Sequence, residues 1–245
     1  TILKPGSFIL RDISSEDYDC VIQERPVLEA PMRKVTYMSS YSGDGDMPFD
    51  EKAYNNTIIP LILYVEGKTR TASDSRERIF NWFNTGKYID FIPYFDQDKI
   101  YKVMPTSAQK FTSRYYMNEG LAVEVSLTVK PYKYYIPDND LVLTAAGSIF
   151  NHTVTPSLPR LKVYGTGNIT LNFSGVLFVM KGVVVHIVLD SERRIAYNGC
   201  SAVLLNENNK VFTRKYPVLN PGANAISWAG TVTSIEIETR WRTLI

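Results

Sequence analysis

The sequence predicts a mainly β protein of two domains, with one α-helix in the first domain. Three observations lead to this fold class. Short runs of β-branched and aromatic residues alternate with Gly, Pro, Asp and Ser along most of the chain. A single segment has helical periodicity, and a proline-containing stretch interrupts the strand pattern near the middle. At 245 residues the chain is long enough for two ordinary domains or one large β unit.

Strand-like runs lie on both sides of the helix in the first half. The most regular is Leu121–Val129, where apolar and polar residues alternate, as in a strand with one buried face. We expect its other face to meet solvent or a neighbouring subunit. The other predicted strands are Phe8–Ile13, Cys20–Gln23, Arg33–Met38 and Ile58–Val65 before the helix, and Tyr88–Pro93, Ile100–Met104 and Phe111–Met117 after it.

The helix is predicted from about Ser75 to Thr85. Asp74 is its expected N-cap, Glu77 stands three residues later as the reciprocal partner, and Gly86 suits the left-handed position after the last turn. The apolar stripe consists of Ile79, Phe80 and Phe83.

The domain boundary is expected in the stretch from Pro131 to Asp140, which loses alternation and contains two prolines. This gives an N-terminal domain of residues 1–132 and a C-terminal domain of residues 133–245. From Leu141 onward, about eight short strands without a helix predict a β-sandwich or jelly roll. They include Leu161–Tyr164, Ile169–Phe173, Val176–Met180, Val183–Leu189 and Ala225–Trp228.

Several turns and irregularities are predicted within this second domain. Gly165–Asn168 is expected to be a hairpin turn, and Pro221 with Gly222 fits a type II turn. A bulge is expected near Ser234, because Val232 and Ile235 fall on opposite faces. Val183–Leu189 is apolar on both faces apart from His186, which is typical of a strand inside a core.

Composition disfavours several classes of partner. Twenty-seven Lys and Arg against twenty-five Asp and Glu leave a net charge of +2, which indicates neither polyanion binding nor a strongly acidic surface, so we expect no specific nucleic-acid binding. No apolar run has membrane-spanning length, and we expect no signal peptide. Cys20 and Cys200 are expected to be buried reduced thiols rather than a disulfide or a reactive site. Chance best explains the glycosylation-type triplets at Asn55, Asn151, Asn168 and Asn172.

A search for catalytic or metal chemistry gives only weak candidates. His152 and His186 lack further ligands at useful spacing, and His186 is expected to be a satisfied core histidine. The Gly43–Asp46 loop lacks the later ligands of a calcium site and is interpreted as a tight turn. The acidic cluster Asp190–Glu192 is likewise interpreted as a turn between strands. We therefore predict no catalytic, cofactor-binding or metal-ligating residue and no enzyme.

Two tryptophans leave an alternative open. Trp228 shares a face with Ile226, which favours a core position over sugar stacking. Trp241 lies between Arg240 and Arg242 and is compatible with an interface.

The run from Tyr216 to Leu244 resembles the C-terminal signature of the distal tail proteins of bacteriophages with long, non-contractile tails (siphophages). The segments that resemble the same family elsewhere are Ser42–Met47, Arg78–Phe83 with Gly86 and Tyr88, Leu158–Leu171 and Leu189–Asn198.

The resemblance implies a structural hub at the tail tip or baseplate. Six N-terminal domains would form a ring around a DNA exit channel, with galectin-like sandwiches outside. The implied partners are its own copies, the tail tube protein, the tail-associated tip protein, the tape measure protein and receptor-binding or baseplate proteins, all in the virion, with no cofactor. The alternative function is a carbohydrate-binding module that recognises a host surface glycan.

Overall fold

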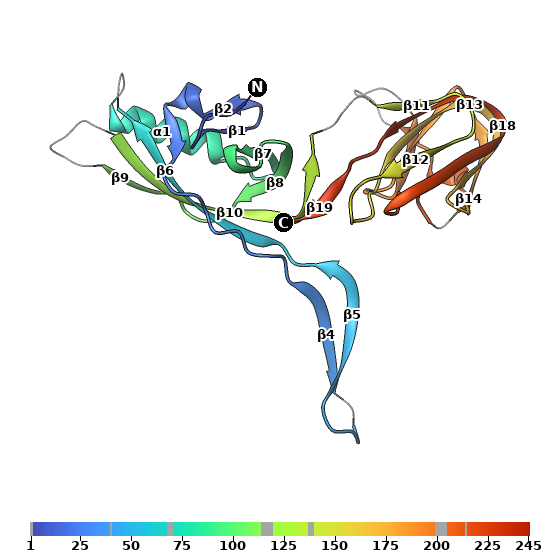
Figure 1. Cartoon of the computed structure of the whole chain (residues 1–245), viewed down its shortest axis with the longest axis horizontal. Helices are drawn as coiled ribbons and strands as arrows, with labels where there is room; N and C mark the ends of the chain where they lie inside the picture. The colour runs from blue at the N-terminus through green and yellow to red at the C-terminus, as the bar shows by residue number, and fades with distance from the viewer. Residues whose placement is uncertain are drawn as a thin grey trace. The chain divides into compact units, whose positions relative to one another are not determined.

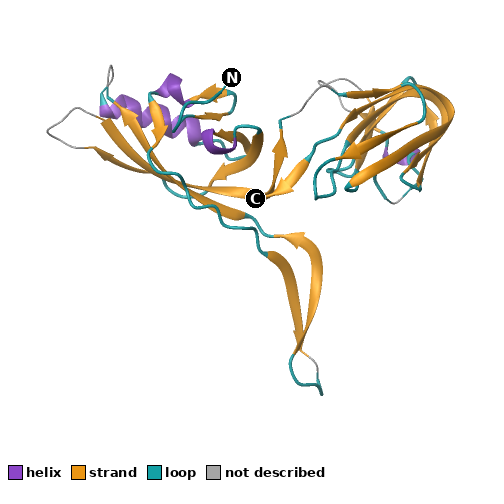
Figure 2. Ribbon diagram, viewed as in Figure 1, coloured by secondary structure: helices purple, strands orange, loops and turns teal. Residues whose placement is uncertain are grey.

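The computed structural model describes residues 2–39, 41–67, 71–113, 120–136, 140–198, 205–213 and 215–245. The chain forms two compact units (Figures 1 and 2). Unit 1 contains the chain up to Lys133 together with Leu244–Ile245, and unit 2 contains Tyr134–Thr243. The sequence-based ranges 1–132 and 133–245 assigned the last two residues to the second domain. They belong to unit 1 because the Ile245 side chain packs against its core.

Most strands of unit 1 form a nine-stranded sheet, in the order β2-β1-β7-β8-β10-β6-β3, with β9 and β19 also paired to β10. The bounds are β1 Phe8–Leu10, β2 Ile13–Ser14, β3 Cys20–Ile22, β6 Thr57–Glu66, β7 Ile89–Pro93, β8 Lys99–Pro105, β9 Lys110–Ser113, β10 Gly120–Tyr135 and β19 Arg242–Leu244. Short 3-10 helices cover Ser15–Tyr18 (η1) and Tyr94–Asp96 (η2).

Two predictions in this unit need correction. The expected strand Phe8–Ile13 is a tight hairpin, because Arg11 and Asp12 both adopt positive φ and reverse the chain between β1 and β2. The strand expected over Phe111–Met117 is described only as far as Ser113, and its remainder lies outside the described residues.

Helix α1 spans Ala72–Phe83, about three residues earlier than predicted. Thr71, not Asp74, is the N-cap: its hydroxyl oxygen accepts a hydrogen bond from the backbone N–H of Asp74. The hydroxyl in turn donates to the Asp74 carboxylate at 2.8 Å. The helix ends at Asn84, and Gly86 has a left-handed φ of 61°, two residues beyond that cap.

The core of unit 1 lies between the helix and the inner faces of its strands. Trp82 stacks on Phe8 with a ring-centroid distance of 5.4 Å, and its indole N–H donates to the Leu10 carbonyl. Cys20 is fully buried in this core, and burial raises the pKa of its thiol to about 12. A thiol in this state is unreactive near neutral pH. Cys200 lies outside the described residues.

Unit 2 is built from a single eight-stranded sheet that continues through two long strands, β13 and β18. One half has the order β11-β18-β13-β15-β16-β17, while β12 pairs with β18 and β14 with β13 in the other half. The bounds are β11 Leu141–Leu143, β12 Gly147–Asn151, β13 Arg160–Phe173, β14 Val176–Val183, β15 His186–Asp190, β16 Ile195–Asn198, β17 Leu205–Asn206 and β18 Gly222–Glu238, with a 3-10 helix (η3) at Asn208–Lys210.

Both long strands bend at a corner where the sheet turns back on itself. The Gly165–Asn168 segment lies within continuous β13, so the prediction of a hairpin turn is wrong. A Cβ at Gly165 would overlap the Thr231 carbonyl oxygen, and one at Gly230 would overlap the Asn168 carbonyl oxygen. The two strands therefore cross so closely that only glycine fits on each. The predicted bulge near Ser234 is confirmed at this corner by the register shift opposite Tyr164 and Gly165.

The inner faces of the folded sheet enclose the core of unit 2. Trp228 packs against this core on the same face as the buried Ile226, as predicted. Val183–Leu189 is not one core strand, because Val185 adopts a positive φ of 64° and interrupts it, leaving Val184 and Val185 exposed. The predicted class, mainly β with one helix in the first domain and a β-sandwich in the second, is confirmed. No helix in the described part of the chain is long and apolar enough to span a membrane.

Candidate interaction surface

Unit 1 carries a long two-stranded hairpin that pairs with no other strand among the described residues. It consists of β4, Arg33–Ser39, and β5, Asp46–Tyr54, and we call residues 33–54 the arm. Figure 1 shows that the arm extends well beyond the sheet of its unit. Nearly every described residue of the arm is exposed, and none belongs to the core of unit 1.

One face of the arm is apolar. Cross-strand pairing places Met38 opposite Met47, and Thr36 opposite Phe49, on the same face. Met38 is 57% exposed, Met47 67% and Phe49 58%. Tyr37, on the opposite face, and Tyr41, at the tip, are also exposed. The arm thus presents contiguous apolar side chains to solvent, which is typical of protein–protein contact sites.

The base of the arm is held by a two-point ion pair. The Arg33 guanidinium donates through Nε to Asp50 Oδ1 at 2.8 Å and through Nη2 to Asp50 Oδ2 at 2.5 Å. The hydrogen bond from Arg33 is the main cause that lowers the pKa of Asp50 to about 2. The backbone N–H of Lys52 donates to the same carboxylate, and Lys52 has a positive φ of 55°. These contacts hold the two strands of the arm together near its base without burying its apolar face.

Burial would stabilise this arm considerably. An isolated two-stranded hairpin is only marginally stable in water. Covering about 100 Å² on each of Met38, Met47 and Phe49 would contribute about 2 kcal/mol per side chain. The arm is therefore a surface whose energetics favour a partner.

Sequence reasoning found β4 and the turn at Gly43–Asp46, both of which the structure bears out as parts of the arm, but it missed β5. Residues 46–54 contain Pro48 and four charged side chains, so they lack the alternation of a half-buried strand. The available signal was the presence of apolar residues on both sides of the glycine turn, with Met38 before it and Met47 after it.

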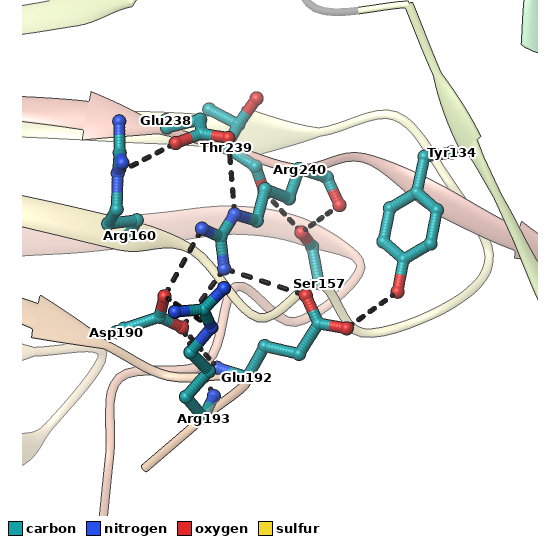
Figure 3. Close-up of polar contacts among 9 residues, drawn as sticks. All are labelled: Tyr134, Ser157, Arg160, Asp190, Glu192, Arg193, Glu238, Thr239 and Arg240. Carbon is teal, nitrogen blue, oxygen red and sulfur yellow. Dashed lines mark hydrogen bonds and ion pairs between the residues drawn. The ribbon is translucent and has the colours of Figure 1, made fainter. Parts of the chain in front are cut away.

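The acidic turn Asp190–Glu192 contacts Arg240 in unit 2 (Figure 3). Asp190 is buried, and the Arg240 guanidinium donates to both of its carboxylate oxygens, at 3.0 and 3.3 Å. Burial alone would raise the pKa of Asp190, but hydrogen bonds from Arg240 and the Arg193 backbone outweigh it and lower the pKa. Glu192 accepts from the Tyr134 hydroxyl and lies 3.5 Å from Arg240.

The same cluster fixes the backbone before β19. Ser157 donates its hydroxyl to the carbonyl oxygens of Thr239 and Arg240, and Arg240 adopts a positive φ of 48° (Figure 3). Glu238 bridges Arg240 and Arg160. The carboxylates of the turn are thus engaged by cations, and the segment joins β15 to β16, as the prediction of a turn between strands requires.

The two histidines lie apart. His186 is half-buried rather than a satisfied core residue, since its Nε2 has no hydrogen-bond partner among the described residues. It packs against Tyr164 on the outer side of the sheet. Exposed His152 lies edge-on between the rings of Tyr135 and Trp241. No group of three or more His, Cys, Asp or Glu suited to a metal ion occurs within the described residues.

Unit 1 also contains a polar cluster centred on Asp96. Its carboxylate accepts hydrogen bonds from Lys133 Nζ at 2.6 Å, the Tyr101 hydroxyl at 2.6 Å and Lys99 Nζ at 3.1 Å. Burial alone would raise the pKa of Asp96, but these donors lower it to about 2. Because Lys133 is the last residue before the chain enters unit 2, the cluster holds the end of unit 1 in place.

Comparison with known proteins finds relatives by fold only. No protein-family model and no curated protein sequence matches the chain. The Dit protein of phage SPP1, described as a paradigm of the hub adsorption apparatus in phages infecting Gram-positive bacteria, shares the fold with a TM-score of 0.67 at 12% identity, over 97% of this chain and 99% of that chain. A chain of the phage P2 baseplate in its activated conformation with Ca matches with a TM-score of 0.54 at 9% identity, over 96% and 98%. The chain has the fold of phage hub and baseplate proteins across both of its units.

Proposed function

We propose that this protein is a structural hub of a bacteriophage tail tip, which assembles with its own copies into a closed, six-membered ring. The arm is the observation that carries the proposal, since its apolar face lies on a hairpin too thin to bury it. The shared fold with the SPP1 hub protein and a P2 baseplate chain supports the setting in a virion.

A ring requires two different patches on each subunit, because one patch contacts the preceding copy and the other contacts the following copy. A projecting arm meets this requirement, because its apolar face is one patch and the body of the neighbouring copy, which binds that face, supplies the other. Six repeated contacts close the ring, so each contact can be modest in strength. The ring joins the tail tube to the tip protein and the receptor-binding apparatus, and its centre is the DNA exit path.

The carbohydrate-binding alternative has less support. Trp228 faces the core of unit 2, and Trp241 is half-buried with its ring edge-on to His152. Each indole is therefore already engaged within unit 2, which leaves less of its ring for stacking on a sugar.

Mass measurement of the purified protein tests the proposal. The wild-type chain, alone or with the tail tube protein, is expected to form a species of six 27.8 kDa subunits. The variant M38S/M47S/F49S is expected to remain monomeric with an unchanged melting temperature. A control variant, V142S/V154S/V184S, removes exposed apolar groups from unit 2 and is expected to assemble normally.

Two results would overturn the proposal. One is a wild-type protein that stays monomeric both alone and with the tube protein. The other is an arm variant that assembles as well as the wild type.

A further inference from the structure

The connection between β14 and β15 contains a strained turn. Val185 has a φ of 64°, which is an outlying conformation for a β-branched residue. The backbone N–H of His186 donates to the Val184 carbonyl at 2.7 Å, so residues 184–186 form a γ-turn with positive φ at its centre, the strained form of this turn. A backbone conformation of this kind costs free energy and persists only where surrounding contacts hold it.

The γ-turn is held by hydrogen bonds rather than by apolar packing. Val184 is 60% exposed and Val185 63%, so neither side chain adds to the core. The Val185 carbonyl accepts from the backbone N–H of Gly165, at the corner of β13, and the Val184 carbonyl accepts from the Asn198 side chain of β16. Of the two strands that flank the turn, β14 pairs with the second half of β13 and β15 with the first half. The γ-turn thus carries the chain across the corner between the two halves of the folded sheet.

His186 is the titratable side chain of the γ-turn. Its imidazole lies beside Tyr164, with 5.8 Å between the ring centres, and its Nε2 atom is shielded from solvent without a hydrogen-bond partner among the described residues. A neutral imidazole tolerates this position when Nδ1 carries the proton, because Nε2 then presents only a lone pair. Protonation adds an N–H at Nε2, which would be a buried donor without an acceptor. The closed turn therefore favours the neutral imidazole.

The charged groups that act on His186 come from β13 and β18. On β13, the Lys162 ammonium lies 4.6 Å from the centre of the Tyr164 ring. On β18, the Glu236 carboxylate accepts from the Tyr164 hydroxyl and lies 3.9 Å from Lys162, so it is already engaged, and Asn198 on β16 is uncharged. Burial is the main cause that lowers the pKa of His186, while Lys162 lowers it further and Glu236 opposes both.

We propose that the γ-turn is an acid-sensitive switch: protonation of His186 opens the turn and loosens the corner of unit 2. In the open form, Nε2 donates to water and Val185 leaves its positive φ. Because the closed turn holds the pKa of His186 below its ordinary 6.5, the open form binds the proton more tightly. The free energy of opening is therefore largest above pH 6.5 and decreases as the pH falls below that value.

The switch goes beyond the ring proposed above and does not depend on it, because all of its residues lie in unit 2. Hydrogen–deuterium exchange followed by mass spectrometry tests it in the intact chain. Exchange is measured at about pH 7.5 and about pH 5.5, on either side of the ordinary histidine pKa, and is corrected for the intrinsic rate at each pH. We expect protection of peptides that contain Gly165 and His186 to fall at least about threefold at the lower pH, while β6 of unit 1 keeps its protection.

Three variants separate the charge of His186 from the strain of the turn. His186→Gln removes the titrating group, so protection at the corner is expected to become independent of pH. His152→Gln is the matched control, because it removes the other histidine of the chain and should leave the pH dependence intact. Val185→Gly admits a positive φ without strain and is expected to raise protection at both pH values.

Three results would overturn the inference. The first is protection at Gly165 and His186 that does not change with pH in the wild type. The second is an equal change in His186→Gln. The third is lower protection in Val185→Gly, since a turn that is not strained gains nothing from glycine.

Discussion

Individual glycines determine how unit 2 folds over. Gly165 and Gly230 lie where β13 and β18 cross, and a Cβ on either would overlap a backbone carbonyl of the facing strand. Since both neighbours are backbone atoms, no side-chain rotation can relieve the overlap. These two residues therefore let one continuous sheet supply both layers of the sandwich.

Gly165→Ala is expected to destabilise the protein by about 1 to 3 kcal/mol, because the backbone of β18 must shift to admit the methyl group. Denaturant unfolding monitored by circular dichroism measures this loss. Gly147→Ala is the matched control: its new Cβ would meet Leu143 at an ordinary 3.7 Å, so we expect a change within about 0.5 kcal/mol. Equal effects of the two substitutions would contradict the account of the corner.

Asp96→Asn is expected to lower the unfolding free energy by about 2 kcal/mol near neutral pH, because an amide replaces the carboxylate that three donors share. The pKa of Asp96 is about 2 in the folded protein against an ordinary 3.8, so its stabilisation is complete above 3.8 and is lost as the pH falls toward 2.

The difference between wild type and Asp96→Asn should therefore shrink as the pH falls from 3.8 toward 2. Urea unfolding across this range measures it. Asp98→Asn is the control, because Asp98 contacts the same Lys99 but is far more exposed. A difference independent of pH would show that the charge of Asp96 does not stabilise unit 1.

At the scale of elements, the sequence predicts the strands and the helix in which buried and exposed side chains follow a regular pattern. The run from Leu121 to Val129 alternates, and β10 buries one face there as expected. The helix was also foreseen, although its start was misplaced because Thr71 and Asp74 can both cap. Side-chain patterns therefore predict most of the sheet and the helix.

Elements without a buried face were not predictable in the same way. Neither face of the arm is buried, so the sequence of β5 lacks the apolar–polar alternation of a half-buried strand. The apolar face of the arm becomes visible only in the fold, where Met38 and Met47 lie opposite each other. Which side chains share an outer face of unit 2 also depends on which strands become neighbours, such as β12 beside β18, and a single sequence does not specify that pairing. The candidate surfaces can thus be identified only from the fold, whereas most core residues can be predicted from the sequence.

Arg33→Ala is expected to loosen the arm without unfolding unit 1. The substitution removes the two-point contact with Asp50, while no arm residue contributes to the core. Hydrogen–deuterium exchange should become at least several-fold faster at amides of β4 and β5 and remain unchanged in β6. Unchanged exchange in the arm would show that Arg33 does not hold it.

At the scale of the whole molecule, unit 1 is formed by two separate segments of the chain. It leaves this unit after Lys133 and returns with Leu244–Ile245, where the backbone N–H of Ile245 donates to the Pro131 carbonyl. Unit 1 therefore depends on residues that follow the whole of unit 2.

Ile245→Ala is expected to lower the stability of unit 1 by about 1 kcal/mol, because this partly buried side chain packs on its core. Ile237→Ala, at a fully buried position of unit 2, should instead destabilise unit 2 by about 2 to 5 kcal/mol. Hydrogen exchange at β6 and at β13 separates the two effects. Loss of protection at β13 but not β6 in Ile245→Ala would contradict the assignment of Ile245 to unit 1.

The central claim is that the protein acts by assembly, with the arm of one copy joined to the body of the next. Electron cryomicroscopy of the tail tip of the phage that carries this chain tests it most directly. The account predicts a closed ring of six copies around an open channel, with each arm, including Met38 and Phe49, buried against a neighbour. A tail tip that lacks the chain, or holds it as separate copies with exposed arms, would contradict the claim.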